Sequence, residues 1–224
     1  MEADRSATWV VVAAYNEGKV IRGVVAEVVR AGWQVVVVDD GSRDNTVAEA
    51  RAGGAIVVRH VVNLGQGAAL QTGIDYAIRR GADRLVTFDA DGQHSCGDIP
   101  ALVAALDRAD VALGSRFLGK AIEGASAQRR LLLRTATLVS NGLSGMNLSD
   151  AHCGFRAFRA SVAPKLRILQ DRMAHASELL RKICTSGVRV VEVPVTVRYT
   201  EHSMSKGQGG AQAVRILFDY FFRV

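Results

Sequence analysis

The sequence predicts an α/β fold in which a mostly parallel central sheet carries helices on both faces. Short, continuously apolar runs such as 35–38 alternate with amphipathic stretches such as 19–31, and strands of this kind are typical of parallel sheets that are buried on both sides. Polar or glycine-containing turns separate the segments. The chain has 224 residues, of which 49% are hydrophobic and only 3 are proline. This composition is enough for one globular domain over 1–224.

The first half of the chain is a regular alternation of strands and helices. Four apolar runs rich in β-branched residues are predicted strands: 8–14, 35–38, 56–59 and 85–88. Three stretches between them, marked by helical spacing or by a helix-opening motif, are predicted helices: 19–31, 44–52 and 67–80. We therefore expect the strands to end at one edge of the sheet, where ligands of such folds bind.

The second half is less regular. Its predicted elements are a helix, a strand, a long helix and a strand pair: 99–108, 111–113, within 128–145, and 188–199. A last amphipathic helix begins at Ala211, and Arg215, Asp219 and Arg223 form its narrow polar stripe. Such a helix packs into a core or another subunit, or lies in a membrane interface. We expect either the membrane surface or a partner protein to cover this helix. The partner would be another copy of the chain, in a homo-oligomer, or an integral-membrane protein.

Charge and cysteine content narrow the class of protein. The net charge of +6 favours anionic partners such as nucleotides or acidic lipids, but no aromatic platform for nucleic acid accompanies the basic residues. The 3 cysteines form no CxxC pair, which argues for a reducing compartment without a disulfide framework or zinc site. We find no secretory leader and no apolar run of the roughly 18 residues that span a bilayer. A cytoplasmic protein, peripheral at the inner membrane face, is expected.

Asp89-Ala90-Asp91, directly after the strand at 85–88, carries the strongest functional signal. Residues two apart in a strand point the same way, so both carboxylates face one side. Paired hard oxygen ligands suit Mg²⁺ or Mn²⁺ holding a diphosphate. The acidic or polar motifs 15–17 and 39–42 follow two other strands at the same edge. Taken alone, each of these motifs also fits a turn or an ordinary surface acidic pair.

Residues 63–67, with the sequence Asn-Leu-Gly-Gln-Gly, open a predicted helix, and their amides could approach a phosphate. The segment does not match the GxxxxGK[ST] P-loop, and no GxGxxG follows the first strand. An ATPase or a dinucleotide-dependent enzyme is therefore disfavoured. A simple helix-starting loop is the alternative reading of this segment.

Several motifs occur in a fixed order along about 8–210: Ala14-Tyr15-Asn16-Glu17, Val38-Asp39-Asp40-Gly41-Ser42-Arg43-Asp44, Asn63-Leu64-Gly65-Gln66-Gly67-Ala68-Ala69, Asp89-Ala90-Asp91-Gly92-Gln93-His94, Gly114-Ser115-Arg116, Asp150 and Gly154-Phe155-Arg156. Together they resemble the family 2 glycosyltransferases of the GT-A (Rossmann-like) fold. The nearest branch is similar to the polyprenyl-phosphate sugar transferases, which include the dolichol-phosphate mannose synthases.

The resemblance implies roles for individual residues. The nucleotide-sugar would contact Ala14, Tyr15, Glu17, Val38, Asp40, Asp89, Ala90, Asp91, Arg116 and Lys206. The divalent metal would be held by Asp89, Asp91 and Gln93, and the catalytic set would be Asp91, Asp150 and Arg116. Members often carry proline at position 14 and an arginine six residues before Lys206. At the second of these positions this chain has Thr200, and Arg198 or His202 would substitute for the missing arginine.

Arg130 and Arg134 share one helix face. They would bind the acceptor phosphate, because the arginine fork matches phosphate oxygens; a solvated basic stripe is the alternative. The expected reaction is metal-dependent, inverting transfer of a sugar from a nucleotide-sugar, of GDP-mannose or UDP-hexose type, to a polyprenyl phosphate. The alternatives are transfer to a saccharide or lipid hydroxyl, nucleotide-sugar synthesis by a nucleotidyltransferase, and a non-catalytic nucleotide-sugar-binding module.

Overall fold

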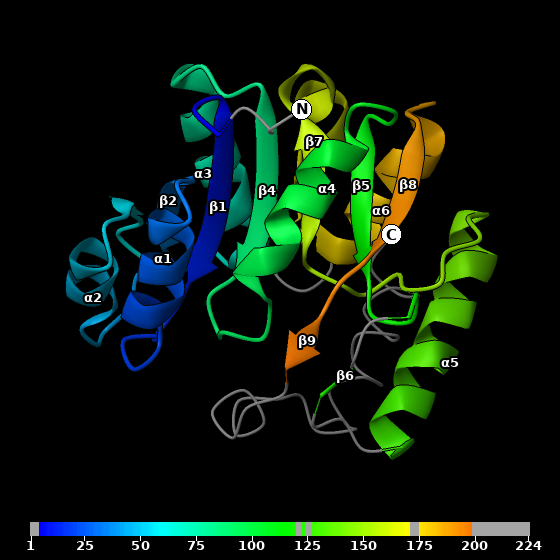
Figure 1. Ribbon diagram of the computed structural model, residues 1–224, viewed down its shortest axis with the longest axis horizontal. Helices are drawn as coiled ribbons and strands as arrows, with labels where there is room; N and C mark the ends of the chain where they lie inside the picture. Colours follow the sequence, from blue (N-terminus) through cyan, green and yellow to red (C-terminus); the bar gives the residue numbers. More distant parts are fainter. Residues whose placement is uncertain (1–4, 120–121, 124–126, 171–174, 199–224) are drawn as a thin grey trace.

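The computed structural model describes residues 5–119, 122–123, 127–170 and 175–198 (Figure 1). Within these residues the main sheet has seven strands in the order β3-β2-β1-β4-β7-β5-β8. Its strands are β1 (Thr8–Ala14), β2 (Gln34–Asp39), β3 (Ile56–Arg59), β4 (Arg84–Asp89), β5 (Val111–Ser115), β7 (Arg156–Arg159) and β8 (Val190–Pro194). A second, two-stranded sheet joins β6 (Ile122–Glu123) to β9 (Val197–Arg198).

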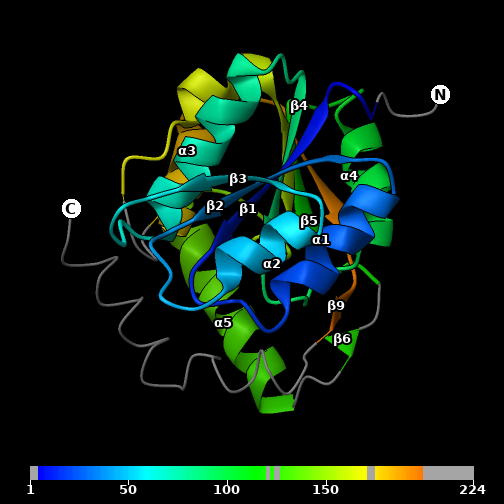
Figure 2. The same ribbon diagram turned by 90° about the vertical axis from the view of Figure 1, so that its left-hand side faces the viewer.

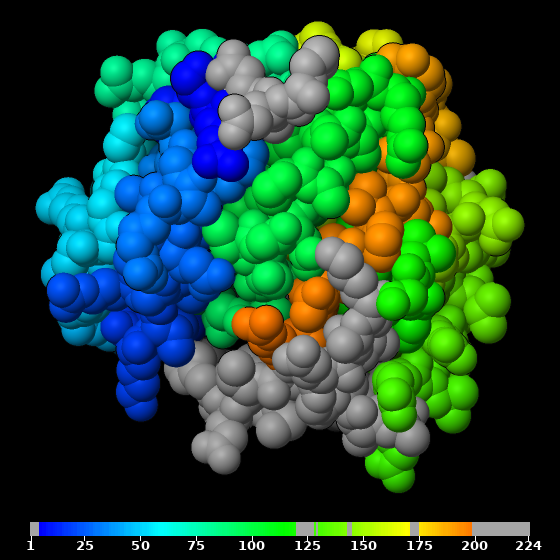
Figure 3. All heavy atoms as spheres, viewed as in Figure 1, coloured from blue at the N-terminus to red at the C-terminus, as the bar shows by residue number. Residues whose placement is uncertain are grey.

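Helices cover both faces of the main sheet, as predicted. They are α1 (Ile21–Arg30), α2 (Thr46–Ala52), α3 (Gln66–Arg79), α4 (Ile99–Ala105), α5 (Ala127–Ser144) and α6 (His175–Thr185). α1 and α4 lie on one face, and α3 and α6 lie on the other (Figures 1 and 2). In the space-filling view of the first face, residues of α1 and α4 cover the middle of the sheet (Figure 3). Among the described residues, no helix is both long and apolar enough to cross a membrane.

The continuous apolar runs in the sequence are explained by two cores, one on each side of the sheet. Alternate residues of a strand point to opposite faces. Val10 and Val12 of β1 therefore pack with α1 and α4, whereas Trp9 and Val11 pack with α3 and α6. Both sets are buried, so a strand in the middle of this sheet has no polar face.

The parallel register brings the polar strand ends to one edge. β1 pairs with β2 and β4 in parallel, and Ala14 lies opposite Asp39 while Ala13 lies opposite Asp89. The amide of Asp40 continues the ladder by donating to the carbonyl of Ala14 at 2.8 Å. The predicted convergence of the first, second and fourth strand ends is thus confirmed.

Several strands of the second half differ from the prediction. β7 was not predicted, and it runs antiparallel between β4 and β5. The strand pair expected over 188–199 is wrong as a pair, because β8 joins β5 in the main sheet and β9 joins β6. Four-residue and two-residue strands carry too little pattern for their partners to be read from sequence. The helix predicted from Ala211 lies outside the described residues.

Candidate functional site

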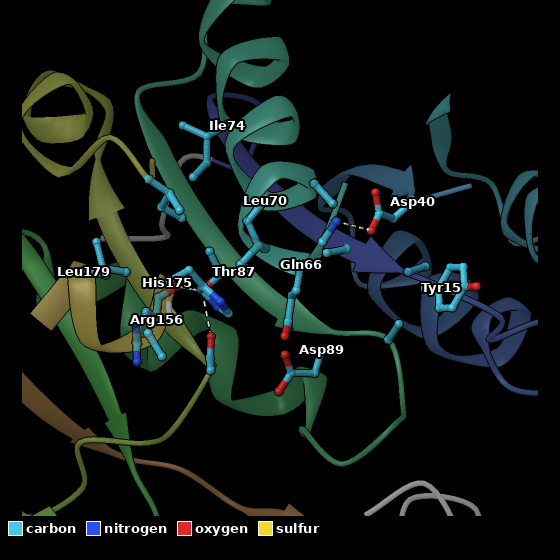
Figure 4. A pocket seen from close by; sticks show the side chains of 18 of the residues that line it. Tyr15, Asp40, Gln66, Leu70, Ile74, Thr87, Asp89, Arg156, His175 and Leu179 are labelled. Atoms are coloured by element: carbon cyan, nitrogen blue, oxygen red, sulfur yellow. Dashed lines mark hydrogen bonds between the residues drawn. The ribbon is translucent and has the colours of Figure 1, made fainter. Parts of the chain in front are cut away.

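A cavity of about 500 Å³ opens at the carboxyl edge of the sheet. Its wall is formed by the ends of β1 and β4, by Asp40 directly after β2, and by residues of α3, β7 and α6. In Figure 4, Tyr15 and Asp40 lie on one side of Asp89, and His175, Arg156 and Leu179 lie on the other. The cavity therefore has an outer end near β1 and β2 and an inner end between β7 and α6.

Of the ten residues predicted to contact a nucleotide-sugar, seven line this cavity. They are Ala14, Tyr15, Glu17, Asp40, Asp89, Ala90 and Asp91. Val38 is fully buried in the core beside them. Arg116 is not part of the wall, and Lys206 lies outside the described residues, as do Thr200 and His202. The structure thus brings seven of the predicted residues, all from the first half of the chain, to one cavity wall.

The turn after β1 is held by the loop after β2. The amide of Asn16, whose φ is +55°, donates to the hydroxyl of Ser42 at 2.9 Å, and the amide of Glu17 donates to Thr46 Oγ1 at 2.8 Å. The Asn16 side chain in turn accepts from the amide of Arg43 at 2.9 Å. These bonds place Tyr15, which is 43% exposed, and Glu17 on the cavity wall.

Asp40 holds the loop that leads into α3. Its Oδ1 lies 2.8 Å from Nδ1 of His60 and accepts from the amide of Leu64 at 2.9 Å. Its Oδ2 accepts from the amide of Gly65 at 2.8 Å. Gly65 has a φ of +99°, a conformation that glycine adopts without strain. Asp40 therefore shapes the wall of the cavity as well as lining it.

Asp89 and Asp91 have opposite electrostatic environments. Burial alone would raise the pKa of Asp89, but the charge and hydrogen bond of His94, with the charge of Arg156, hold it below its usual value. The pKa of Asp91 is raised, because burial and the neighbouring charge of Asp89 both disfavour its ionised form. The amide of Gln93 partly offsets this by donating to Asp91 Oδ1 at 3.0 Å.

This carboxylate pair fits a divalent cation. A bound cation would offset the repulsion from Asp89, which together with burial raises the pKa of Asp91. In the described part of the chain, no group of three or more His, Cys, Asp or Glu side chains could hold a metal ion. Two carboxylates by themselves would leave coordination positions open, as is usual for Mg²⁺ bound through one or two carboxylates and substrate phosphates. Gln93 lies in the same loop as the pair.

Gly154 permits the position of Asp89. A Cβ atom added at Gly154 would lie 2.8 Å from Oδ2 and 2.9 Å from Oδ1 of Asp89. We expect Gly154→Ala to displace this carboxylate and to weaken Mn²⁺ binding by at least about 10-fold, as for changes beside metal ligands. The loss of free Mn²⁺ signal in an electron paramagnetic resonance titration measures this. Gly23→Ala is the control, because a Cβ there meets nothing within 4 Å, and an unaltered affinity in Gly154→Ala would contradict the expectation.

Arg116 and Asp150 form a buried ion pair with each other. Nε of Arg116 lies 2.6 Å from Oδ2 of Asp150, and Nη2 lies 2.8 Å from Oδ1. Burial opposes ionisation of Asp150, but the hydrogen bonds and charge of Arg116 hold its pKa below the usual value. Neither residue lines the cavity. The pair joins the end of β5 to the segment before β7, and its predicted catalytic role stays a prediction.

Arg130 and Arg134 lie on the exposed surface of α5 and not on the cavity wall. The guanidinium of Arg134 lies 5.3 Å from the centre of the ring of Phe117, which follows Arg116 in the sequence. The backbone amide of Arg198 donates to the carbonyl of Gln93 at 2.8 Å, so β9 contacts the loop after Asp91. The substrate contacts predicted for these three arginines stay predictions.

The inner end of the cavity contains residues that sequence reasoning did not place there. Arg156 is buried, and its Nε donates to the carbonyl of Cys153 at 2.9 Å. His152 and His175, which have no ligand spacing in the sequence, also line the wall. The pairing of Thr87 with Arg156 across β4 and β7 brings Arg156 close to Asp89. No local signal identifies the two histidines, whereas Arg156 belongs to the motif Gly154-Phe155-Arg156, which marked it without placing it in the cavity.

Comparison with known proteins gives consistent matches. The family described as Glycosyl transferase family 2 matches residues 9–167. The polyprenol monophosphomannose synthase of Mycolicibacterium smegmatis is 34% identical over 90% of this chain and 81% of its own length. The UDP-N-acetylglucosamine–dolichyl-phosphate N-acetylglucosaminyltransferase of Methanococcus voltae is 30% identical over 96% of this chain and 94% of its own length.

A solved structure shares the fold. It is glucosyl-3-phosphoglycerate synthase of Mycobacterium tuberculosis, in complex with Mn²⁺, uridine diphosphate and phosphoglyceric acid, with a TM-score of 0.70 and 20% identity. The match covers 96% of this chain and 78% of that one. The similarity confirms the predicted arrangement of a mostly parallel sheet between helices.

Proposed function

Because this chain belongs to glycosyl transferase family 2, we propose that it transfers a sugar from a nucleotide-sugar to a polyprenyl phosphate, with Mg²⁺ or Mn²⁺ on the donor diphosphate. The observation that carries the proposal is the pair Asp89 and Asp91 on the wall of a cavity that also contains Tyr15, Glu17 and Asp40. Relatives named as polyprenol-phosphate and dolichyl-phosphate sugar transferases support the lipid-phosphate acceptor.

The outer end of the cavity would take the nucleoside. Tyr15 offers an exposed ring, and the loop that Asp40 holds at Leu64 and Gly65 forms the adjoining wall. The donor diphosphate would then extend toward Asp89 and Asp91. When bound there, the cation would neutralise the charge that develops on the departing nucleoside diphosphate. The sugar would lie toward the inner end, and attack from the opposite side of the anomeric carbon would invert its configuration.

Two carboxylates that could serve as a base for a hydroxyl acceptor are already engaged, which favours an acceptor that is already anionic. A hydroxyl acceptor needs a general base within hydrogen-bond reach of its proton. Asp150 is engaged by Arg116 outside the cavity, and Asp40 is engaged by His60, Leu64 and Gly65. A phosphate monoester has its second pKa near 6, so at neutral pH it needs positioning and charge neutralisation more than a base. A lipid-borne acceptor would bring the protein to the membrane face.

The test is a transfer assay with labelled GDP-mannose, UDP-glucose and UDP-N-acetylglucosamine, each with polyprenyl phosphate and with Mn²⁺ or a chelator. We expect label to enter the organic phase with at least one donor, and only when metal is present. Label that stays in the aqueous phase with every donor would overturn the lipid-phosphate proposal. Label in the organic phase despite the chelator would overturn the metal requirement.

Arg130 tests where the acceptor phosphate binds. We expect Arg130→Ala to raise the KM for polyprenyl phosphate by about 10-fold or more, because a charge-assisted contact to phosphate is lost, while the KM for the donor changes little. Steady-state kinetics with each substrate varied in turn measures the KM for the acceptor and the KM for the donor separately. Arg108→Ala is the charge-matched control, because Arg108 is an exposed arginine outside both the cavity and α5. Equal acceptor KM values for Arg130→Ala and the control would remove Arg130 from the acceptor site.

A further inference from the structure

We propose that His94 is a positioning residue for Asp89 and determines which oxygen of that carboxylate is presented to the divalent cation. Nε2 of His94 lies 2.8 Å from Oδ2 of Asp89. A carboxylate oxygen can only accept, so Nε2 carries the hydrogen of this bond. Oδ2 is thereby engaged, and Oδ1 is the oxygen left to face a cation. The inference rests on the metal role given to Asp89 in the proposed function.

The contacts of the imidazole distinguish this role from simple packing. Nδ1 of His94 is buried and has no hydrogen-bond partner among the described residues. A buried nitrogen without a partner is unfavourable, and an apolar side chain in the same place would avoid it. The bond to Asp89 is what a histidine provides here and an apolar residue does not.

Aromatic neighbours hold the imidazole ring in one orientation. The ring of Phe88 packs edge-on at a centroid distance of 5.6 Å, and the ring of Phe155 lies at 4.9 Å. The His94 side chain is only 4% exposed. Since the ring is packed by both phenyl groups, Nε2 stays directed at Asp89.

The backbone of the loop is also anchored. His94 forms an isolated antiparallel bridge with Val197, and the carbonyl of Gln93 accepts from the amide of Arg198 at 2.8 Å. The carboxylate of Asp98, further along, accepts from the amide of Thr196 at 2.6 Å. β9 and the residues before it therefore fix the loop that carries His94.

The arrangement leaves Asp89 with one orientation. His94 holds Oδ2, and the backbone at Gly154 lies so close that a Cβ there would be 2.8 Å from Oδ2 and 2.9 Å from Oδ1. Asp91, in contrast, receives a backbone hydrogen bond from Gln93 within its own loop. A ligand oriented before the metal arrives loses less freedom on binding, and outer partners of metal ligands commonly change affinity by about 10–100-fold.

The experiment compares His94→Gln with His94→Met in the full chain. The glutamine amide can reach where Nε2 lies, and methionine has similar length without a donor. Mn²⁺ affinity is measured by electron paramagnetic resonance, and the thermal midpoint is measured without metal. We expect His94→Met to bind Mn²⁺ about 10–100-fold more weakly, and His94→Gln to recover most of this loss although both variants lose the same aromatic packing. His94→Phe, which keeps a packed ring without the donor, is expected to match His94→Met.

Three results would overturn the inference. The first is a wild-type Mn²⁺ affinity in His94→Met and His94→Phe. The second is an equal loss of Mn²⁺ affinity in His94→Gln and His94→Met when their thermal midpoints are equal. The third is a wild-type protein that does not bind Mn²⁺. Failure of the proposed function would look different. In that case no donor would transfer its label to polyprenyl phosphate, while the order of Mn²⁺ affinities among the variants would persist.

Discussion

Replacing Asp91 by asparagine is expected to abolish sugar transfer while the protein keeps its fold. The asparagine retains the size of the side chain but lacks the charge that would hold a cation, so we expect activity to fall by more than about 100-fold, beyond the loss typical of outer partners of a metal ligand. The assay is metal-dependent transfer of label to polyprenyl phosphate. Transfer at a rate near that of the wild type would contradict the metal role of Asp91.

The stability of the same variant separates a lost ligand from a damaged fold. Burial and the charge of Asp89 raise the pKa of Asp91. A raised pKa means that the folded state loses stability as pH rises through the folded value, because the ionised form is disfavoured there. Asparagine does not ionise, so without metal we expect Asp91→Asn to melt at or above the wild-type temperature at pH 7. Added Mn²⁺ should raise the melting temperature of the wild type alone. A marked fall without metal would indicate damage to the fold.

Replacing Asp150 by alanine is expected to cost about 3–5 kcal/mol of unfolding free energy, because it leaves the buried guanidinium of Arg116 without its carboxylate. Urea denaturation at pH 7 measures this loss. Asp107→Ala is the control: it also removes the carboxylate of an arginine pair, at 2.9 Å from Arg84, but the Asp107 side chain is 47% exposed. Exposed pairs contribute about 0–1 kcal/mol. Equal losses in the two variants would contradict the structural importance of the buried pair.

The pH dependence of that loss has a defined sign. The pKa of Asp150 is held below its usual value by Arg116. The stabilisation is therefore fully present above the unfolded pKa, which is about 3.9 for aspartate, and is lost as pH falls through the folded pKa. We expect the difference between wild type and Asp150→Ala to be constant from pH 7 to about pH 5 and to shrink below about pH 4. A difference that grew in acid would exclude this origin.

Local pattern was sufficient for the first half of the fold. The apolar runs of β1, β2 and β4 are buried from both sides, so their composition alone marks them as central parallel strands. Parallel pairing then requires their ends to meet at one edge. For this reason the sequence by itself determined that Tyr15, Asp40, Asp89 and Asp91 would gather, and the order of motifs identified the family.

Only the tertiary structure decided the inner half of the site. β7 is four residues long and lies antiparallel between β4 and β5, and this placement brings Gly154 and Arg156 against Asp89. The pairing of Arg116 with Asp150 and the bond from His94 to Asp89 depend on side chains that packing brings together. Contacts between residues distant in sequence, or within an irregular loop, depend on how the whole chain packs. Neither composition nor periodicity records that packing.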